Sequence, residues 1–133
     1  MFDLPPSHAR KAVLFLVAFF FTFAGVSHFT NTAFFVSIMP SYLPLHYEAV
    51  YLSGVFEIMG GLGVLLAGTR QWAGYGLLAL LVAVYPANIY MAMTPELFPD
   101  TTPTMLYVRL PLQFLMAWCV WWSTRPNQVE FAD

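Results

Sequence analysis

Long apolar runs separated by short polar stretches dominate the chain. Four such runs cover residues 12–30, 49–67, 72–93 and 105–123. Each holds about twenty residues, and at 1.5 Å per residue a helix of that length crosses the roughly 30 Å hydrocarbon core of a bilayer. The pattern predicts an all-α membrane protein, a four-transmembrane-helix antiparallel bundle formed by residues 1–133 as a single domain.

The composition agrees with a membrane protein and argues against other classes. Of the 133 residues, 59% are hydrophobic and 9% are charged, whereas about a quarter of the residues are charged in a typical soluble domain. A formal charge of −2 and scattered basic residues argue against nucleic acid as a partner. The single cysteine, Cys119, excludes an intrachain disulfide. We therefore expect the lipid bilayer to surround the chain.

The connections between the apolar runs differ in character. Residues 31–48 are too apolar for an aqueous loop and too short to span the membrane. This combination predicts an interfacial helix or a re-entrant lid. Gly68 and Arg70 mark a tight turn, and three prolines stiffen residues 94–104. The first run is longer than the hydrophobic part of a usual signal peptide, so we expect it to remain as a span.

Basic residues and aromatic rings predict the orientation. Four of the five Lys and Arg residues fall on one side of the predicted membrane: Arg10, Lys11, Arg70 and Arg125. By the positive-inside rule that side, with both termini, is cytoplasmic. The four tryptophans lie near the same interface and five tyrosines near the opposite one, as interfacial anchors do.

Polar side chains interrupt all four apolar runs at a similar depth. Helical counting places them roughly 3 to 13 Å below the outer surface. They are His28, Glu57, Asn88, Arg109 and Gln113. An acidic residue at the centre of a membrane helix costs roughly 2.5 to 3.5 kcal/mol on insertion scales, so Glu57 needs a partner, a proton or a function. The spacing predicts a small polar chamber that opens outward.

Two interpretations of these five residues remain open. Glu57 and Arg109 can form a structural ion pair that fixes the register of the helices. Asn88 and Gln113 would then be interhelical hydrogen-bonding residues. Alternatively, the five residues bind a ligand: Arg109 offers donors to a carbonyl or an anion, and Glu57 or His28 exchanges a proton with it. Glu57 and His28 are also the candidate catalytic residues if the chain is an enzyme.

The sequence also limits the possible cofactors. A haem held across the membrane needs two buried histidines, and only His28 is suitable, so we expect no haem. A metal site would rest on His28 and Glu57 without further ligands, so we expect no metal. The sequence contains no glycine-rich phosphate loop or nucleophile elbow. A quinone, an isoprenoid or another amphiphile fits a polar site above apolar helix faces.

Five motifs resemble, in order, one known family. They are FAGVSHF at 23–29, a proline-bounded stretch at 40–44, the glycine-rich run 51–63, YPANIYMA at 85–92 and VRLPLQ at 108–113. This order resembles the DoxX-like family of small bacterial integral membrane proteins, over residues 12–122. The resemblance implies a four-helix bundle in the bacterial inner membrane. Members are named for association with thiosulfate:quinone oxidoreduction, which implies a redox-associated subunit.

Together these observations predict an integral membrane subunit with an outward-facing polar pocket. We expect the pocket to bind a quinone-like or other lipophilic molecule and the protein to serve a larger redox complex. The alternatives are a purely structural or assembly subunit and a small membrane enzyme that transfers protons on a lipid. A bundle of this size exposes most of its surface to lipid, so protein partners or a homo-oligomer are further expectations.

Overall fold

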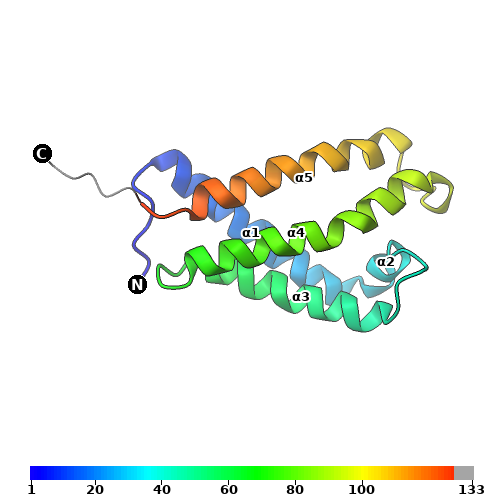
Figure 1. Cartoon of the computed structure of the whole chain (residues 1–133), viewed down its shortest axis with the longest axis horizontal. Coiled ribbons are helices and arrows are strands. Elements are labelled where there is room, and N and C mark those ends of the chain that lie inside the picture. The colour runs from blue at the N-terminus through cyan, green and yellow to red at the C-terminus, as the bar shows by residue number, and fades with distance from the viewer. Residues whose placement is uncertain (128–133) are drawn as a thin grey trace, which may run out of the picture.

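The computed structural model describes residues 1–127, and helices form most of this range. Four long helices run antiparallel: α1 (His8–Thr30), α3 (His46–Gly63), α4 (Arg70–Met93) and α5 (Pro103–Thr124). A short helix, α2 (Thr32–Ser37), and a 3-10 turn, η1 (Pro95–Leu97), lie in the connections at one end of the bundle. The N-terminus and the end of α5 lie at the other end (Figure 1). The described residues contain no strand, in agreement with the predicted all-α class.

The helix boundaries differ from the predicted ones by a few residues. The second apolar run ends as a helix at Gly63, four residues earlier than predicted, because residues 64–69 form the turn before α4. The first helix begins at His8, four residues earlier than predicted. The hydroxyl of Ser7 caps it by accepting a hydrogen bond from the backbone N–H of Arg10 (3.2 Å).

Two buried guanidinium groups, those of Arg10 and Arg70, close helix ends at the N-terminal end of the bundle. Their acceptors at the helix ends are Val64 O and Leu65 O for Arg70, and Trp122 O and Arg125 O for Arg10, at 2.7 to 3.1 Å. Arg70 also donates to the carbonyl oxygens of Phe2 and Asp3 in the N-terminal segment. Carbonyl groups at a helix C-terminus carry the negative end of the helix dipole. Arg70 and Arg10 are therefore satisfied by the ends of α3 and α5 without a carboxylate partner.

The four long helices form a closed ring. α1 packs most extensively along α3, and α4 packs along α5. Contacts between α3 and α4 and between α1 and α5 complete the ring. α2 lies against α3 and α1, at the end of the bundle far from the N-terminus (Figure 1).

The core consists of two apolar clusters. The cluster nearer the N-terminal end, which we call the near cluster, contains Leu14, Val17, Ala18, Phe21, Val64, Leu77, Leu81 and Val120. The cluster beneath α2 and η1, the far cluster, contains Ile38, Met91, Ala92, Phe98 and Leu106. In α4, Asn88 falls in the sequence between the residues of the two clusters, and in α5 Gln113 does the same. These two predicted polar residues thus lie where one apolar cluster gives way to the other.

Glycines allow α1 and α3 to approach closely. A Cβ atom at Gly25 would lie 2.7 Å from Gly54 O, and one at Gly54 would lie 2.8 Å from the Cβ of His28. A Cβ atom at Gly61 would lie 2.5 Å from the hydroxyl oxygen of Thr22 and 2.8 Å from its backbone nitrogen. These distances are shorter than real Cβ contacts, so this interface requires glycine. Small residues serve the same purpose between membrane helices.

Two helices, α1 and α4, are long and apolar enough to cross a membrane by length and composition. Only 33% and 22% of the residues in their most apolar windows are buried inside the bundle. Large apolar side chains remain on the outer surface, among them Phe19 at 71% and Val82 at 75% exposure. Apolar surface on this scale marks contact with lipid or with another protein. α1 and α4 are therefore candidate membrane spans.

Two glycines test whether α1 and α3 are in close contact. We expect Gly61→Ala to destabilise the fold by about 1–3 kcal/mol, because the added methyl group would overlap Thr22. Gly76 in α4 has no atom within 4 Å of a Cβ position. Gly76→Ala should therefore be neutral or stabilise by up to about 1 kcal/mol through helix propensity. Thermal unfolding followed by circular dichroism in detergent measures both, and equal midpoints for the two variants would contradict the close approach.

Candidate functional site

α1 and α3 bring His28 and Glu57 together inside the bundle. Nε2 of His28 lies 3.1 Å from Oε2 of Glu57, and the two residues are only 6% and 8% exposed. Glu57 shares a helix face with Gly54 and Gly61, three residues before it and four after it, so the close contact with α1 turns Glu57 inward. This is the only ion-pair contact between side chains of residues 1–127.

Backbone and hydroxyl groups of α3 hold the other ring nitrogen of His28. Nδ1 lies 2.9 Å from Val50 O and 3.0 Å from the hydroxyl oxygen of Ser53. The Ser53 hydroxyl in turn donates to Val50 O at 3.0 Å. A carbonyl oxygen can only accept a hydrogen bond, so Nδ1 of His28 must carry a hydrogen. The surroundings thereby fix the tautomer of the neutral ring.

This tautomer determines what the contact with Glu57 requires. If Nδ1 carries the hydrogen of a neutral ring, Nε2 has a bare lone pair, which would repel a carboxylate oxygen at 3.1 Å. The contact is favourable when Nε2–H⁺ faces a carboxylate, or when a protonated carboxyl group donates to Nε2. Each arrangement contains the same number of protons and no net charge. His28 and Glu57 therefore form a neutral pair that shares one proton.

The pair is closely packed but its hydrogen bonding is not saturated. Oε2 of Glu57 is shielded from solvent, and apart from its 3.1 Å contact with Nε2 of His28 it has no partner within the described part of the chain. A carboxylate oxygen has two lone pairs, and the contact with His28 uses only one of them. Glu57 thus retains an acceptor position for a second partner.

The helix α2 covers the pair at the end of the bundle. The ring of Phe35 lies 4.0 Å from the imidazole ring of His28, centroid to centroid, at an interplanar angle of 41°. Phe35 also packs against the far cluster. A short helix is thus present within residues 31–48, where the sequence predicted an interfacial helix or lid. Phe35 thus covers His28 at this end of the bundle.

Asn88 and Gln113 meet between α4 and α5. Asn88 Nδ2 donates to Gln113 Oε1 (2.6 Å), and Gln113 Nε2 donates to the carbonyl oxygen of Leu81. Pro86 lies within α4 and lacks the N–H that would bind the preceding turn, which loosens the backbone there. Both amide side chains therefore act as interhelical hydrogen-bonding residues, one of the two predicted interpretations.

Arg109 does not join either pair. It lies half-buried on α5, and within residues 1–127 its guanidinium makes neither a hydrogen bond nor an ion pair. The predicted ion pair between Glu57 and Arg109 is therefore absent, and Glu57 contacts His28 in its place. The structure thus divides the five predicted residues into two contacting pairs and one separate cation.

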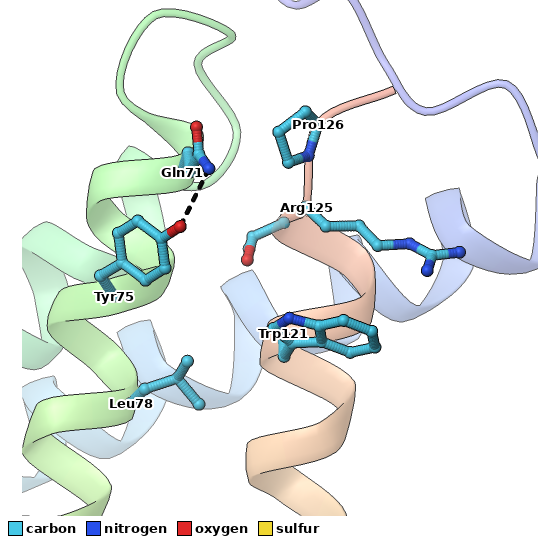
Figure 2. Close-up of a pocket in the computed structure, with 7 residues that line it drawn as sticks. Gln71, Tyr75, Leu78, Trp121, Arg125 and Pro126 are labelled. Atoms are coloured by element: carbon cyan, nitrogen blue, oxygen red, sulfur yellow. Dashed lines mark hydrogen bonds between the residues drawn. The ribbon is translucent and has the colours of Figure 1, made fainter. Parts of the chain in front are cut away.

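Two cavities lie away from these residues. A small one of about 60 Å³, between α4 and α5 at the N-terminal end, is lined by Gln71, Tyr75 and Trp121 among others. There the amide of Gln71 donates to the hydroxyl of Tyr75 at 3.0 Å (Figure 2). A larger apolar groove of about 750 Å³ runs along the outer face of α3 and α4, from Phe56 to Trp72. None of the five predicted residues lines either cavity.

Two residues that contact His28, Ser53 and Phe35, were not among the predicted site residues. Ser53 precedes Glu57 by one helical turn, so its position on the same face was visible, but its bond to His28 depends on how α1 meets α3. Phe35 gave no signal beyond its place in an apolar connection. Within residues 1–127, no group of three or more His, Cys, Asp or Glu side chains is arranged to hold a metal ion.

Comparison with known proteins gives one match. Residues 17–124 match the family described as a domain of unknown function (DUF8561). No curated protein and no solved structure matches the chain. The matched range covers most of the chain and includes all five predicted site residues and Ser53.

Proposed function

The chain belongs to the DUF8561 domain family, and we propose that it is an integral membrane subunit that binds a quinone-like or other lipophilic molecule. The observation that carries this proposal is the buried contact between His28 and Glu57, which holds one shared proton inside an apolar bundle. Ionisable pairs within membrane helices are expensive to bury and mark proton or ligand sites. We propose that the bound molecule serves a larger redox complex.

The proposal requires all four long helices to span the membrane. α3 has 18 residues and α5 has 22, which suffices for the hydrocarbon core beside α1 and α4. Both helices expose large apolar side chains, including Met59 at 61% and Phe114 at 66%, and direct Glu57 and Gln113 inward. This arrangement supports a lipid-facing exterior around a polar layer.

The ends of the bundle support an inner-membrane orientation with cytoplasmic termini. Arg10, Arg70 and Arg125 gather at the end that holds the N-terminus, and α2 and η1 lie at the other end (Figure 1). Positive charge marks the cytoplasmic side of bacterial membrane proteins. Relationship to the DoxX-like family is part of the same proposal, and His28, Glu57, Asn88 and Gln113 all lie in the motifs that carry that resemblance.

Cysteine labelling tests this topology. In a Cys119→Ser background, Ser41→Cys lies in the exposed connection before α3 and Gln71→Cys at the exposed start of α4. We expect a membrane-impermeant maleimide to label Ser41→Cys in intact spheroplasts and to label Gln71→Cys only after the membrane is opened. Labelling of both positions from outside, or of Gln71→Cys alone, would contradict four spans with cytoplasmic termini.

The site can bind a head group that carries oxygen. Glu57 Oε2 has no partner other than His28 in the described residues, and the proton that the two share can be offered to a carbonyl or hydroxyl oxygen placed beside it. The apolar clusters on either side suit a hydrocarbon tail or ring. Because Phe35 covers His28, entry of a ligand requires α2 to move away from the ring. No residue of α2 itself is buried, so the contacts that such a movement breaks are chiefly those of Phe35 and of Ile38, which caps the helix.

A purely structural subunit is the second candidate function. The burial of His28 and Glu57, and the absence of either residue from the two cavities, favour it. In that case the pair fixes how α1 packs on α3, and the outer surfaces bind the partner proteins. Removal of one member of a buried pair would then reduce stability by about 3–5 kcal/mol without affecting any ligand.

Mass spectrometry of all lipids and proteins that co-elute with the tagged chain from mild detergent separates the two candidates. We expect wild type to retain a near-stoichiometric lipophilic molecule and Glu57→Gln to retain about tenfold less, the effect of losing one charge-assisted hydrogen bond. Glu96→Gln, which changes an exposed carboxyl group at the same end of the bundle, should retain the wild-type amount. Ligand binding would be contradicted if the wild-type chain co-elutes with a partner protein and no lipophilic molecule, and if Glu57→Gln retains the same partner.

A further inference from the structure

Arg109 carries the only guanidinium at the end of the bundle that holds the far cluster, within residues 1–127. It lies on α5 between Leu106 and Leu110, which both belong to or pack against that cluster. A guanidinium remains charged at all relevant pH values and offers five donors in a planar fork. None of these donors has an acceptor among the described residues. In a membrane-spanning bundle such a cation is costly unless it finds a partner or reaches the interface.

The surrounding side chains do not supply that partner. The shared proton leaves His28 and Glu57 without net charge as a pair. Asn88 and Gln113 are uncharged and satisfy each other. The remaining carboxyl groups at this end, those of Glu48, Glu96 and Asp100, are exposed and make no ion pair within the described part of the chain. The polar layer together with Arg109 therefore has an excess of one positive charge.

Helix geometry directs Arg109 toward the same interior. Arg109 precedes Gln113 by four residues, so both side chains lie on one face of α5. That face points into the bundle, because Gln113 reaches Asn88 and the carbonyl oxygen of Leu81 on α4. Arg109 is one turn closer than Gln113 to the end that α2 covers. Arg109 thus lies on the α5 side of the end that holds the far cluster, where its donors are available to a head group bound at that end.

We infer that the molecule bound at this site is an acidic amphiphile whose carboxylate or phosphate oxygen atoms bind Arg109. This inference rests on the proposed function and narrows its ligand from any lipophilic molecule to one with an anionic oxygen head group. The fork of a guanidinium binds a carboxylate or phosphate through two parallel hydrogen bonds. The anion cancels the excess charge, and where the head group is a phosphate, the proton shared by His28 and Glu57 remains available to one of its other oxygens.

Thermal shift measurements in a non-ionic detergent test the inference with matched probes. Oleate and oleyl alcohol have the same chain and differ in the head group, and an alkaline buffer keeps oleate ionised. We expect oleate to raise the unfolding midpoint of the wild-type chain and oleyl alcohol to leave it nearly unchanged, since only a bound ligand stabilises. Arg109→Gln should bind oleate about tenfold more weakly or worse, and Arg109→Lys should retain part of the affinity.

Arg125→Gln is the matched control, because Arg125 is a half-buried arginine that follows the other end of α5 and stacks on Trp121 at 5.3 Å. It should bind oleate like wild type. Bicelles of phosphatidylglycerol against phosphatidylcholine identify the source of the oxyanion: an Arg109-dependent shift with phosphatidylglycerol alone assigns the site to a membrane lipid phosphate and supports the same chemistry. If Arg109→Gln fails to fold, two measurements still test the inference. They are the comparison of oleate with oleyl alcohol in wild type and the affinity of Arg109→Lys for oleate.

Two results would overturn the inference. The first is an equal shift with oleate and oleyl alcohol in wild type. The second is an equal loss of oleate binding in Arg125→Gln and Arg109→Gln, which would show a non-specific charge effect. If both probes raise the midpoint equally in wild type and Glu57→Gln abolishes both increases, the inference about an anion fails but the proposed function stands. If neither probe nor either lipid shifts the midpoint and no molecule co-purifies with the chain, both proposals fail.

Discussion

The polar interior depends on how closely α1 approaches α3. Gly25, Gly54 and Gly61 remove the side chains that would hold the two backbones apart. At that separation the ring of His28 reaches both Val50 O on one side and Glu57 on the other. A wider interface would leave the imidazole without its carbonyl acceptor and Glu57 as an isolated buried acid, which is far more costly than a neutral pair.

The remaining charges are arranged so that they do not compete for Glu57. Arg10 and Arg70 are satisfied by carbonyl oxygens at the C-terminal ends of α5 and α3, far from the pair. The amides of Asn88 and Gln113 satisfy each other. At the end of the bundle that holds the far cluster, Arg109 is the one Lys or Arg side chain within residues 1–127, and it keeps unused donors. The bundle thus combines one proton-sharing pair and one unmatched cation in a largely apolar interior, which is the basis of the proposed ligand chemistry.

The sequence predicted much of the fold because long apolar runs specify helices directly. It placed the four long helices to within a few residues, and counting along them brought His28, Glu57, Asn88, Arg109 and Gln113 to a similar depth. It could not predict which of them touch, because contacts depend on the rotation of each helix, and the glycines beside Glu57 turn it toward α1 and away from α5. A helix or lid within residues 31–48 was predicted, but the contact of Phe35 with His28 was not, because it depends on how this connection folds back onto α1. The start of α3 was equally hard to predict, because it follows Leu45, whose left-handed backbone (φ 58°) is usual for glycine or asparagine.

The most direct test of the shared proton is the tautomer of His28, measured by nitrogen NMR of chain labelled with ¹⁵N-histidine. His28→Gln identifies its signals against those of His8 and His46. The structure predicts that Nδ1 of His28 carries a hydrogen and that the Nε2 resonance moves when Glu57 is changed to Gln. A neutral ring with its hydrogen on Nε2 alone, or an Nε2 signal that Glu57→Gln leaves unchanged, would contradict a proton shared between His28 and Glu57.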